Sequence, residues 1–173
     1  MRAVVFTLAL GSLFTLPVHA AEPEDYAGNF VLADMDATQA ELDRAVEAGA
    51  SQFPAFIRPV ARGKLRNAVQ AVDWFVFEPG GEKMTIKTNV VPQGWTTDLK
   101  ATPTDVQAAD GETLSLKRWM EDGNLTAKGC RETGCSVFRF QLSDDGKSLT
   151  MHVVTSSKRL EEPLRYALQY HRK

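Results

Sequence analysis

Side chains that could perform chemistry are few in this sequence, and their spacing does not form a reacting set. Two histidines follow residue 20, His152 and His171, and alternation places both on the outer faces of strands. No HxxxH pair, GxSxG turn, glycine-rich phosphate loop or Cys–His pair occurs. The acidic runs "ADMDATQAE" and "SDDG" are typical of a helix cap and a hairpin turn. The sequence therefore predicts a protein that is not an enzyme and that holds no metal or cofactor.

The two cysteines, Cys130 and Cys135, flank the turn-like stretch "RETG". Cysteines on either side of a hairpin turn are typical of a disulfide in an oxidising compartment. A redox pair is the alternative, although its usual spacing is CxxC. We expect a structural disulfide, whose short loop contributes about 2 kcal/mol to stability.

The first 20 residues have the features of a secretory signal. Arg2 precedes the 14-residue apolar run "AVVFTLALGSLFTL", and "PVHA" places small residues before a cleavage point at Ala21. This run is shorter than the ~20 residues that a membrane-spanning helix needs. We therefore expect residues 21–173 to form one domain in a periplasmic or secreted protein. Those residues include 19 basic and 22 acidic ones, and this net charge of −3 does not indicate nucleic-acid binding.

From Val72 onward, apolar and polar residues alternate over short runs that turn residues separate. "VDWFVFE" and "EKMTIKT" flank "PGG", while "SVFRFQL" and "KSLTMHVVTS" flank "SDDG", so both pairs predict hairpins. About nine or ten such strands indicate a mainly β fold, either an antiparallel barrel or a sandwich. One face of successive strands is apolar, and in a barrel that face points inward.

The only helical stretch directly follows the first β-prone run, which covers residues 28–33. "TQAE" (residues 38–41) matches a capping box, and apolar residues follow it at helical spacing. A second helix, which begins near Pro54, is expected to bury Phe53, Phe56, Ile57 and Val60. Arg58, Arg62 and Arg66 share its other face, either as a surface for an anionic membrane or as an ordinary solvated face.

This helix pair has a physical use in a barrel. An up-and-down barrel of about ten strands is too wide for its own side chains to fill, and its end is open. A helix pair with one apolar face can cover that end as a lid. The barrel interpretation is therefore favoured over the sandwich.

The stretch "YAGNFVLADMD" resembles the opening of fatty-acid-binding proteins and lipocalins, with Gly28, Phe30 and Leu32 in the matching places. The order of one strand, two helices and then strands to the C-terminus is also similar to that family. The resemblance implies an up-and-down barrel that holds a fatty acid or another lipid. Members often bind a ligand carboxylate with an Arg-x-Tyr pair on the last strand, but here Ala167 stands two residues after Arg165. In nitrobindin-like barrels a histidine near this end binds haem, whereas His171 is expected to face outward.

Another inward cation could replace the missing pair. In "TLSLKRWM", Arg118 shares its face with Leu114, Leu116 and Met120, and a desolvated arginine can bind a carboxylate or phosphate in a bidentate manner. Alternatively, Arg118 lies at the barrel rim, or a bulge turns it outward. The other residues that we expect around the ligand are Met84, Ile86, Phe138, Phe140, Met151, Tyr166 and Tyr170.

A second class of function fits the same fold. A small secreted barrel can be a protein–protein interaction module, an inhibitor or an envelope-assembly factor, with side chains filling its interior. Cavity volume separates the two hypotheses, because a carrier of a small hydrophobic ligand needs an empty apolar interior.

Overall fold

The computed structural model of the protein describes residues 20–173, so the predicted secretory signal lies outside the described residues except for Ala20. A 3-10 helix, η1 (Pro23–Tyr26), precedes strand β1 (Gly28–Leu32) and two helices, α1 (Met35–Ser51) and α2 (Arg58–Ala68). Nine strands follow: β2 (Trp74–Gly80), β3 (Lys83–Thr88), β4 (Trp95–Asp98), β5 (Thr104–Gln107), β6 (Thr113–Glu121), β7 (Asn124–Arg131), β8 (Gly134–Leu142), β9 (Ser148–Ser157) and β10 (Leu164–Arg172).

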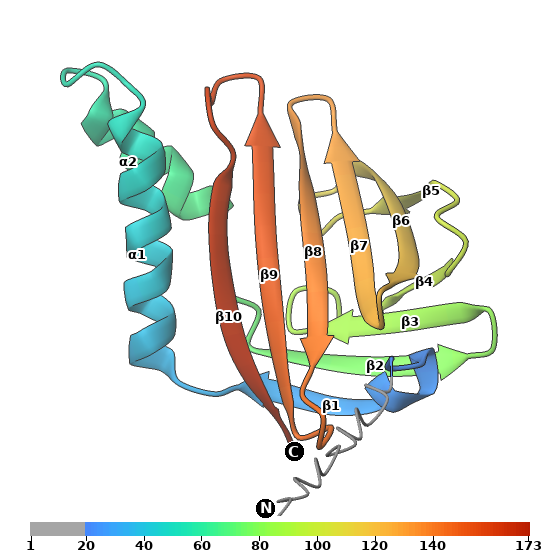
Figure 1. Cartoon of the computed structure of the whole chain (residues 1–173). Coiled ribbons are helices and arrows are strands. Elements are labelled where there is room, and N and C mark those ends of the chain that lie inside the picture. Colours follow the sequence, from blue (N-terminus) through green and yellow to red (C-terminus); the bar gives the residue numbers. More distant parts are fainter. Residues whose placement is uncertain (1–19) are drawn as a thin grey trace, which may run out of the picture.

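All ten strands form one antiparallel sheet, which curls into a nearly closed barrel (Figure 1). Strands pair with their neighbours in sequence except at β4 and β5, and β1 also pairs with β10, so β4 and β5 are the two edges of the sheet. One contact joins these two edges, and two more join the residues after β4 to β6. The Trp95 indole N–H donates to the Gln107 carbonyl across 3.0 Å, Lys100 forms a bridge with Trp119, and the Ala101 N–H donates to the Arg118 carbonyl. The predicted barrel is confirmed.

Aromatic side chains fill the lower half of the barrel. Phe30, Phe75, Phe77 and Phe140 are buried there, and Phe77 and Phe140 meet edge to face with ring centroids 5.3 Å apart. Tyr26 of η1 closes the bottom, because its hydroxyl donates to the Phe140 carbonyl at 2.8 Å and accepts the Leu125 N–H at 3.1 Å. These bonds satisfy backbone groups that would otherwise be buried without a partner.

Helix α1 begins earlier than the sequence predicted. Asp34 is its N-cap, and the Asp34 carboxylate accepts the Ala37 N–H at 2.9 Å. The predicted capping box at residues 38–41 is wrong, because Thr38 lies inside the helix and is buried. Glu41 binds outside the helix instead: its carboxylate accepts the backbone N–H of Ala167 on β10 at 3.0 Å.

That hydrogen bond belongs to a larger contact between α1 and an open edge of β10. Strand β1 pairs with β10 only from Tyr170 to Arg172, so the rest of β10 has no strand on that side. Helix α1 stands beside this part of β10 (Figure 1). At Gly49 the helix comes so close that an added Cβ would lie 2.5 Å from the Leu164 side chain. Glycine therefore permits the close approach of α1 to the barrel.

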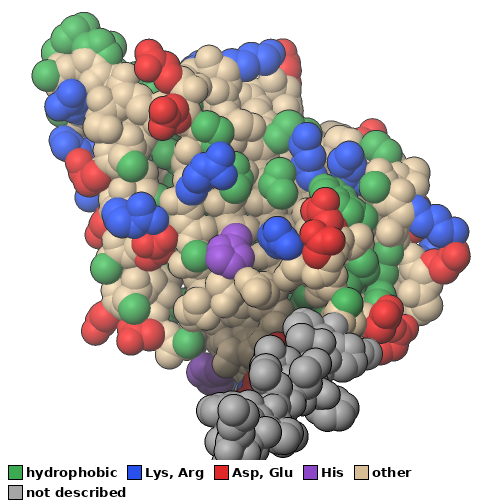
Figure 2. Space-filling view, in the orientation of Figure 1, with side chains coloured by type: hydrophobic (Ala, Val, Ile, Leu, Met, Phe, Trp, Pro, Cys, Tyr) green, Lys and Arg blue, Asp and Glu red, His purple; other side chains and the backbone are tan. Residues whose placement is uncertain are grey.

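The second helix does not bury the apolar residues that we expected it to bury. Phe56 is 83% exposed, Val60 62% and Ile57 37%, while Phe53 is half-buried. Helix α2 starts only at Arg58 and turns Ala61 and Leu65 toward the protein, which leaves the connection between the helices at a free tip. Figure 2 shows this apolar tip at the upper left. We call Phe56, Ile57 and Val60 the lid tip.

The three arginines of α2 bind to partners in α1 and in the turn between the two helices. The Arg62 guanidinium makes two hydrogen bonds to the Glu47 carboxylate, at 2.7 and 2.8 Å, and Arg66 lies 3.6 Å from Asp43. The Arg58 Nε donates to the Phe53 carbonyl at 3.0 Å. The arginine face of α2 thus joins α2 to α1 and closes the turn that precedes α2.

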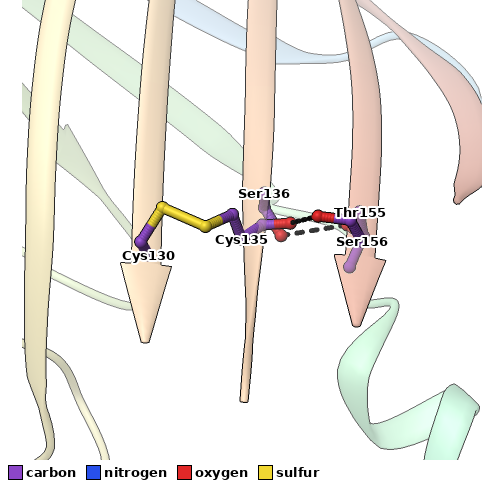
Figure 3. The surroundings of a disulfide bond; sticks show 5 residues. All are labelled: Cys130, Cys135, Ser136, Thr155 and Ser156. Atoms are coloured by element: carbon purple, nitrogen blue, oxygen red, sulfur yellow. Dashed lines mark hydrogen bonds between the residues drawn. A yellow bond between two sulfur atoms is a disulfide. The ribbon is translucent and has the colours of Figure 1, made fainter. Parts of the chain in front are cut away.

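The disulfide between Cys130 and Cys135 is confirmed (Figure 3). The two residues lie directly opposite each other on β7 and β8, next to the turn that joins these strands. Beside them, the Ser156 hydroxyl donates to the Cys135 carbonyl at 3.2 Å, and the Ser136 and Thr155 hydroxyls lie 2.9 Å apart. The disulfide and these bonds hold β7, β8 and β9 together at the upper end of the barrel.

Candidate functional site

The upper half of the barrel encloses a cavity of about 350 Å³. Its wall is mainly apolar, and Phe75, Phe140 and Met151 lie at its lower end, beside the aromatic cluster. The end of α2 and the segment that follows it, residues 67–72, form one side of its mouth. Ligand pockets commonly have volumes of roughly 300–1,000 Å³, so the cavity can hold one small ligand.

Arg118 lies in the wall of this cavity. The inward side chains of β6–β10 form levels, and the register places Arg118 at the same level as Ala127, Phe138 and Tyr166. This level lies one step below Leu116, Ser136 and Thr155, and one step above Phe140 and Met151. Arg118 is thus at the middle of the barrel wall rather than at the rim, and no bulge turns it outward.

The guanidinium of Arg118 is incompletely satisfied. Only 2% of the residue is exposed, and Nη1 donates to the carbonyls of Met84 and Trp95, each at 2.8 Å. Its Nε is buried and has no partner among residues 20–173, and none of the ion pairs between described residues includes Arg118. Burial lowers the pKa of Arg118 to about 10, which still leaves it charged at neutral pH. A buried cation without an anion is costly, and an anionic ligand in the cavity would supply the missing acceptor.

Tyr166 contributes a second polar group at the same level. Burial raises the pKa of Tyr166 to about 12, so its hydroxyl stays protonated and can donate a hydrogen bond at neutral pH. The residue lines the same cavity as Arg118. A guanidinium and a phenol that both reach one cavity can bind the two oxygens of a carboxylate.

The mouth of the cavity is held by ion pairs. Arg131, at the end of β7, lies 2.5 Å from Asp110 and 2.8 Å from Glu112, both in the turn between β5 and β6. The hydroxyls of Ser136 and Thr155 face the cavity just below this rim. Because Arg131 already has two carboxylate partners, Arg118 is the cation in the wall that an anionic ligand could neutralise.

The structure brings most of the predicted site residues to the cavity. Arg118, Ile86, Phe138, Phe140, Met151 and Tyr166 line it. Met84 and Tyr170 instead belong to the packed core, where the Tyr170 hydroxyl donates to the Val72 carbonyl at 3.0 Å. The sequence reasoning missed residues 67–72, because nothing in their pattern shows that the chain returns from α2 across the barrel mouth.

No group of three or more His, Cys, Asp or Glu side chains within residues 20–173 is arranged to hold a metal ion. Neither α1 nor α2 is long and apolar enough to cross a membrane, and no other described helix is. His171 points away from the cavity on β10 and is exposed.

Comparison with known proteins finds the same fold in solved structures. No family model matches the sequence, and no curated protein sequence does. Solved structures do match. A Schistosoma mansoni fatty-acid-binding protein in complex with arachidonic acid is 17% identical, with a TM-score of 0.51 over 86% of this chain and 96% of the other.

Two further structures give the same result. Lipid binding protein 8 of Caenorhabditis elegans is 11% identical, with a TM-score of 0.53 over 90% of this chain and all of the other. A zebrafish ileal bile-acid-binding protein complexed with cholic acid is also 11% identical, with a TM-score of 0.52 over 86% and 99% of the two chains. At such low identity the likeness shows the fold and not the ligand. The protein has an antiparallel barrel fold like that of these fatty-acid-binding and bile-acid-binding proteins.

Proposed function

We propose that this protein is a non-catalytic carrier that holds one small amphipathic anion, of the fatty-acid or lipid class, inside its barrel. The observation that supports this most strongly is Arg118, a buried guanidinium with an unpartnered Nε in the wall of an apolar cavity. The anionic head would bind Arg118 and Tyr166, and the apolar body would lie against Phe138, Phe140 and Met151. An empty cavity of about 350 Å³ does not fit an interaction module with a packed interior.

We also propose that the carrier is exported. The first 20 residues have the features of a secretory signal, and the disulfide between Cys130 and Cys135 suits an oxidising compartment such as the periplasm. Both observations agree with a carrier that moves its ligand outside the cytoplasm.

A titration with matched ligands tests the role of Arg118. The probe is dansylaminoundecanoic acid, and its methyl ester has the same apolar body without the charge. We expect Arg118→Met to weaken binding of the acid at least about tenfold, because a hydrogen bond to a charged group contributes about 1.5–3 kcal/mol. The ester should bind the wild type and Arg118→Met equally.

The controls separate a charge effect from a loss of structure. Arg159→Met removes an exposed arginine in the loop between β9 and β10, and it should leave both affinities unchanged. Arg118→Lys should recover part of the preference for the acid. The proposal would be wrong if Arg118→Met bound the acid and the ester as the wild type does.

A specific observation favours a second activity of the helix pair. The lid tip exposes Phe56, Ile57 and Val60, with Arg58 between Ile57 and Val60 in sequence, and the other end of α2 lines the cavity. We propose that this tip contacts an anionic membrane, which brings the cavity close to lipid. Of the three arginines, Arg62 and Arg66 pair with acids of α1, so the apolar tip would make the main contact.

Vesicle flotation tests the membrane contact. Phe56→Ser/Val60→Ser should lose binding to phosphatidylglycerol vesicles and keep the wild-type thermal stability, because both side chains are exposed. Met35→Ser changes a similarly exposed apolar residue at the other end of α1 and should bind as the wild type does. Equal binding by all three proteins would exclude the lid tip as the contact.

A further inference from the structure

Five consecutive strands each place a basic side chain at a neighbouring position on the outer wall of the barrel. These residues are Lys117 of β6, Lys128 of β7, Arg139 of β8, His152 of β9 and Arg165 of β10, and we call them the basic band. Lys117 lies directly opposite Lys128, Arg139 lies opposite His152, and Arg165 lies one strand beyond, opposite Val154. Figure 2 shows Lys and Arg side chains and a histidine on the face of the barrel turned to the viewer.

No member of the basic band forms an ion pair with a carboxylate of the described residues, whereas six other cations form such pairs: Arg44, Arg62, Arg66, Lys87, Lys100 and Arg131. Glu121 is the only acidic residue at an outward position of β6–β10. Like charges directly opposite each other on adjacent strands are destabilising, so stability does not explain the pairing of Lys117 with Lys128.

The shape of the band indicates what could bind to it. Adjacent strands lie about 4.8 Å apart, so five strands give a band roughly 19 Å wide that runs across the convex wall. Half-buried Val137 and Val154 lie within it, and the Lys117 Nζ lies 5.3 Å from the centre of the Trp119 ring. An array of Lys and Arg side chains on a partly apolar floor complements an extended anionic chain.

We propose that the basic band binds an extended acidic segment of a partner protein. A bilayer fits less well, because the large exposed apolar side chains of the described residues are Met35, Phe56, Ile57, Val60 and Val90, none of which lies on this wall. A nucleic acid fits less well, because the whole sequence has a net charge of −2 and a pI of about 5.9. This binding does not depend on the ligand in the cavity.

Fluorescence anisotropy with fluorescein-labelled octaglutamate tests the proposal. The wild type should bind this peptide, and added salt should weaken binding. Lys117→Gln/Lys128→Gln/Arg139→Gln should bind about tenfold more weakly or worse, since each exposed charge contact contributes about 0.2–1 kcal/mol. Lys64→Gln/Lys83→Gln/Lys158→Gln has the same net charge but changes exposed lysines outside the band, and it should bind like the wild type.

A second variant keeps the test independent of folding. Lys128→Glu turns the like-charged pair with Lys117 into an opposite pair, so it should raise the melting temperature while it weakens peptide binding. Absence of peptide binding by the wild type, or equal loss in the control variant, would overturn the proposal. A third outcome would also overturn it. In that outcome the wild type binds phosphatidylglycerol vesicles or single-stranded oligothymidylate, and the band variant loses this binding but keeps the wild-type affinity for octaglutamate.

Discussion

At the scale of single residues, the barrel tolerates one buried charge that its own side chains do not neutralise. Arg118 is held by two backbone carbonyls, and burial lowers its pKa without removing its charge at neutral pH. A well-packed apolar residue in its place would avoid the desolvation cost. The arginine is therefore best explained by a ligand that binds it.

The tyrosines predict how stability depends on alkaline pH. All three tyrosines of the sequence are buried; burial raises the pKa of Tyr166 to about 12 and raises those of Tyr26 and Tyr170 above the usual value near 10. Groups with a raised pKa in the folded state stabilise the fold fully below pH 10, and this contribution is lost as the pH rises through 12. The lowered pKa of Arg118 makes the free energy of unfolding rise over the same pH range, but this comes from one residue, whereas three tyrosines lower it.

We therefore expect the free energy of unfolding, measured with urea, to fall by about 2 kcal/mol between pH 9.5 and pH 11.5. Tyrosinate absorbance at 295 nm should stay low in the folded protein and appear together with unfolding. A tyrosinate titration with a midpoint near pH 10 in protein that is still folded would contradict the buried positions of these residues.

Most of the inward-facing residues could be predicted from sequence because strands alternate strictly. Ile86, Phe138, Met151 and Tyr166 all lie on the predicted face. The same rule indicated that Arg118 shares the apolar face, but only the registers of β6–β8 show that no bulge intervenes. Alternation shows which face of a strand a residue lies on, but not how far along the barrel it lies. Tyr170 and Met84, which belong to the packed core, therefore could not be distinguished from the residues that line the cavity.

At the scale of elements, the helix pair is positioned by the open edge of β10 as well as by its own apolar face. Glu41 accepts the Ala167 N–H, and Arg44, which donates to Glu41, also donates to the Arg165 carbonyl at 3.3 Å. The hydrogen bonds from Arg44 are the main reason why the pKa of Glu41 is lowered. Helix α1 thus occupies the place that a longer β1 would fill.

Removing the Glu41 carboxylate should loosen this contact. We expect Glu41→Ala to lower the free energy of unfolding by about 1–2 kcal/mol, because the Ala167 N–H loses its partner. The amide hydrogen of Ala167 should also exchange with solvent faster in this variant. Glu47→Ala breaks an exposed pair with Arg62 on the same helix and should leave the urea midpoint close to that of the wild type. Equal effects of the two variants would show that α1 is not held through Glu41.

The sequence predicted the existence of the helix pair but not its packing. The pattern of Phe53, Phe56, Ile57 and Val60 resembles a buried face, yet the late start of α2 at Arg58 leaves Phe56, Ile57 and Val60 at the tip. The capping box was misplaced because Asp34, one residue before the helix, also has a capping side chain. Helix starts depend on backbone conformation, which residue types alone do not determine.

At the scale of the whole molecule, the order of strands and turns was sufficient to predict an up-and-down barrel. The predicted hairpins β2–β3 and β8–β9 are confirmed by their registers. Strand β5 was missed because Val106 is the only apolar residue of its four. The cavity could not be predicted, because the packing of Phe75, Phe77 and Phe140 decides how much of the interior stays empty.

Native mass spectrometry of the full chain, purified from cells that export it and followed by denaturing extraction, shows whether the barrel carries an amphipathic anion. We expect a complex with one bound molecule, which extraction identifies as a lipid with an acidic head, and we expect less of it on Arg118→Met. A bare protein mass, together with no uptake of dansylaminoundecanoic acid, would contradict the carrier function.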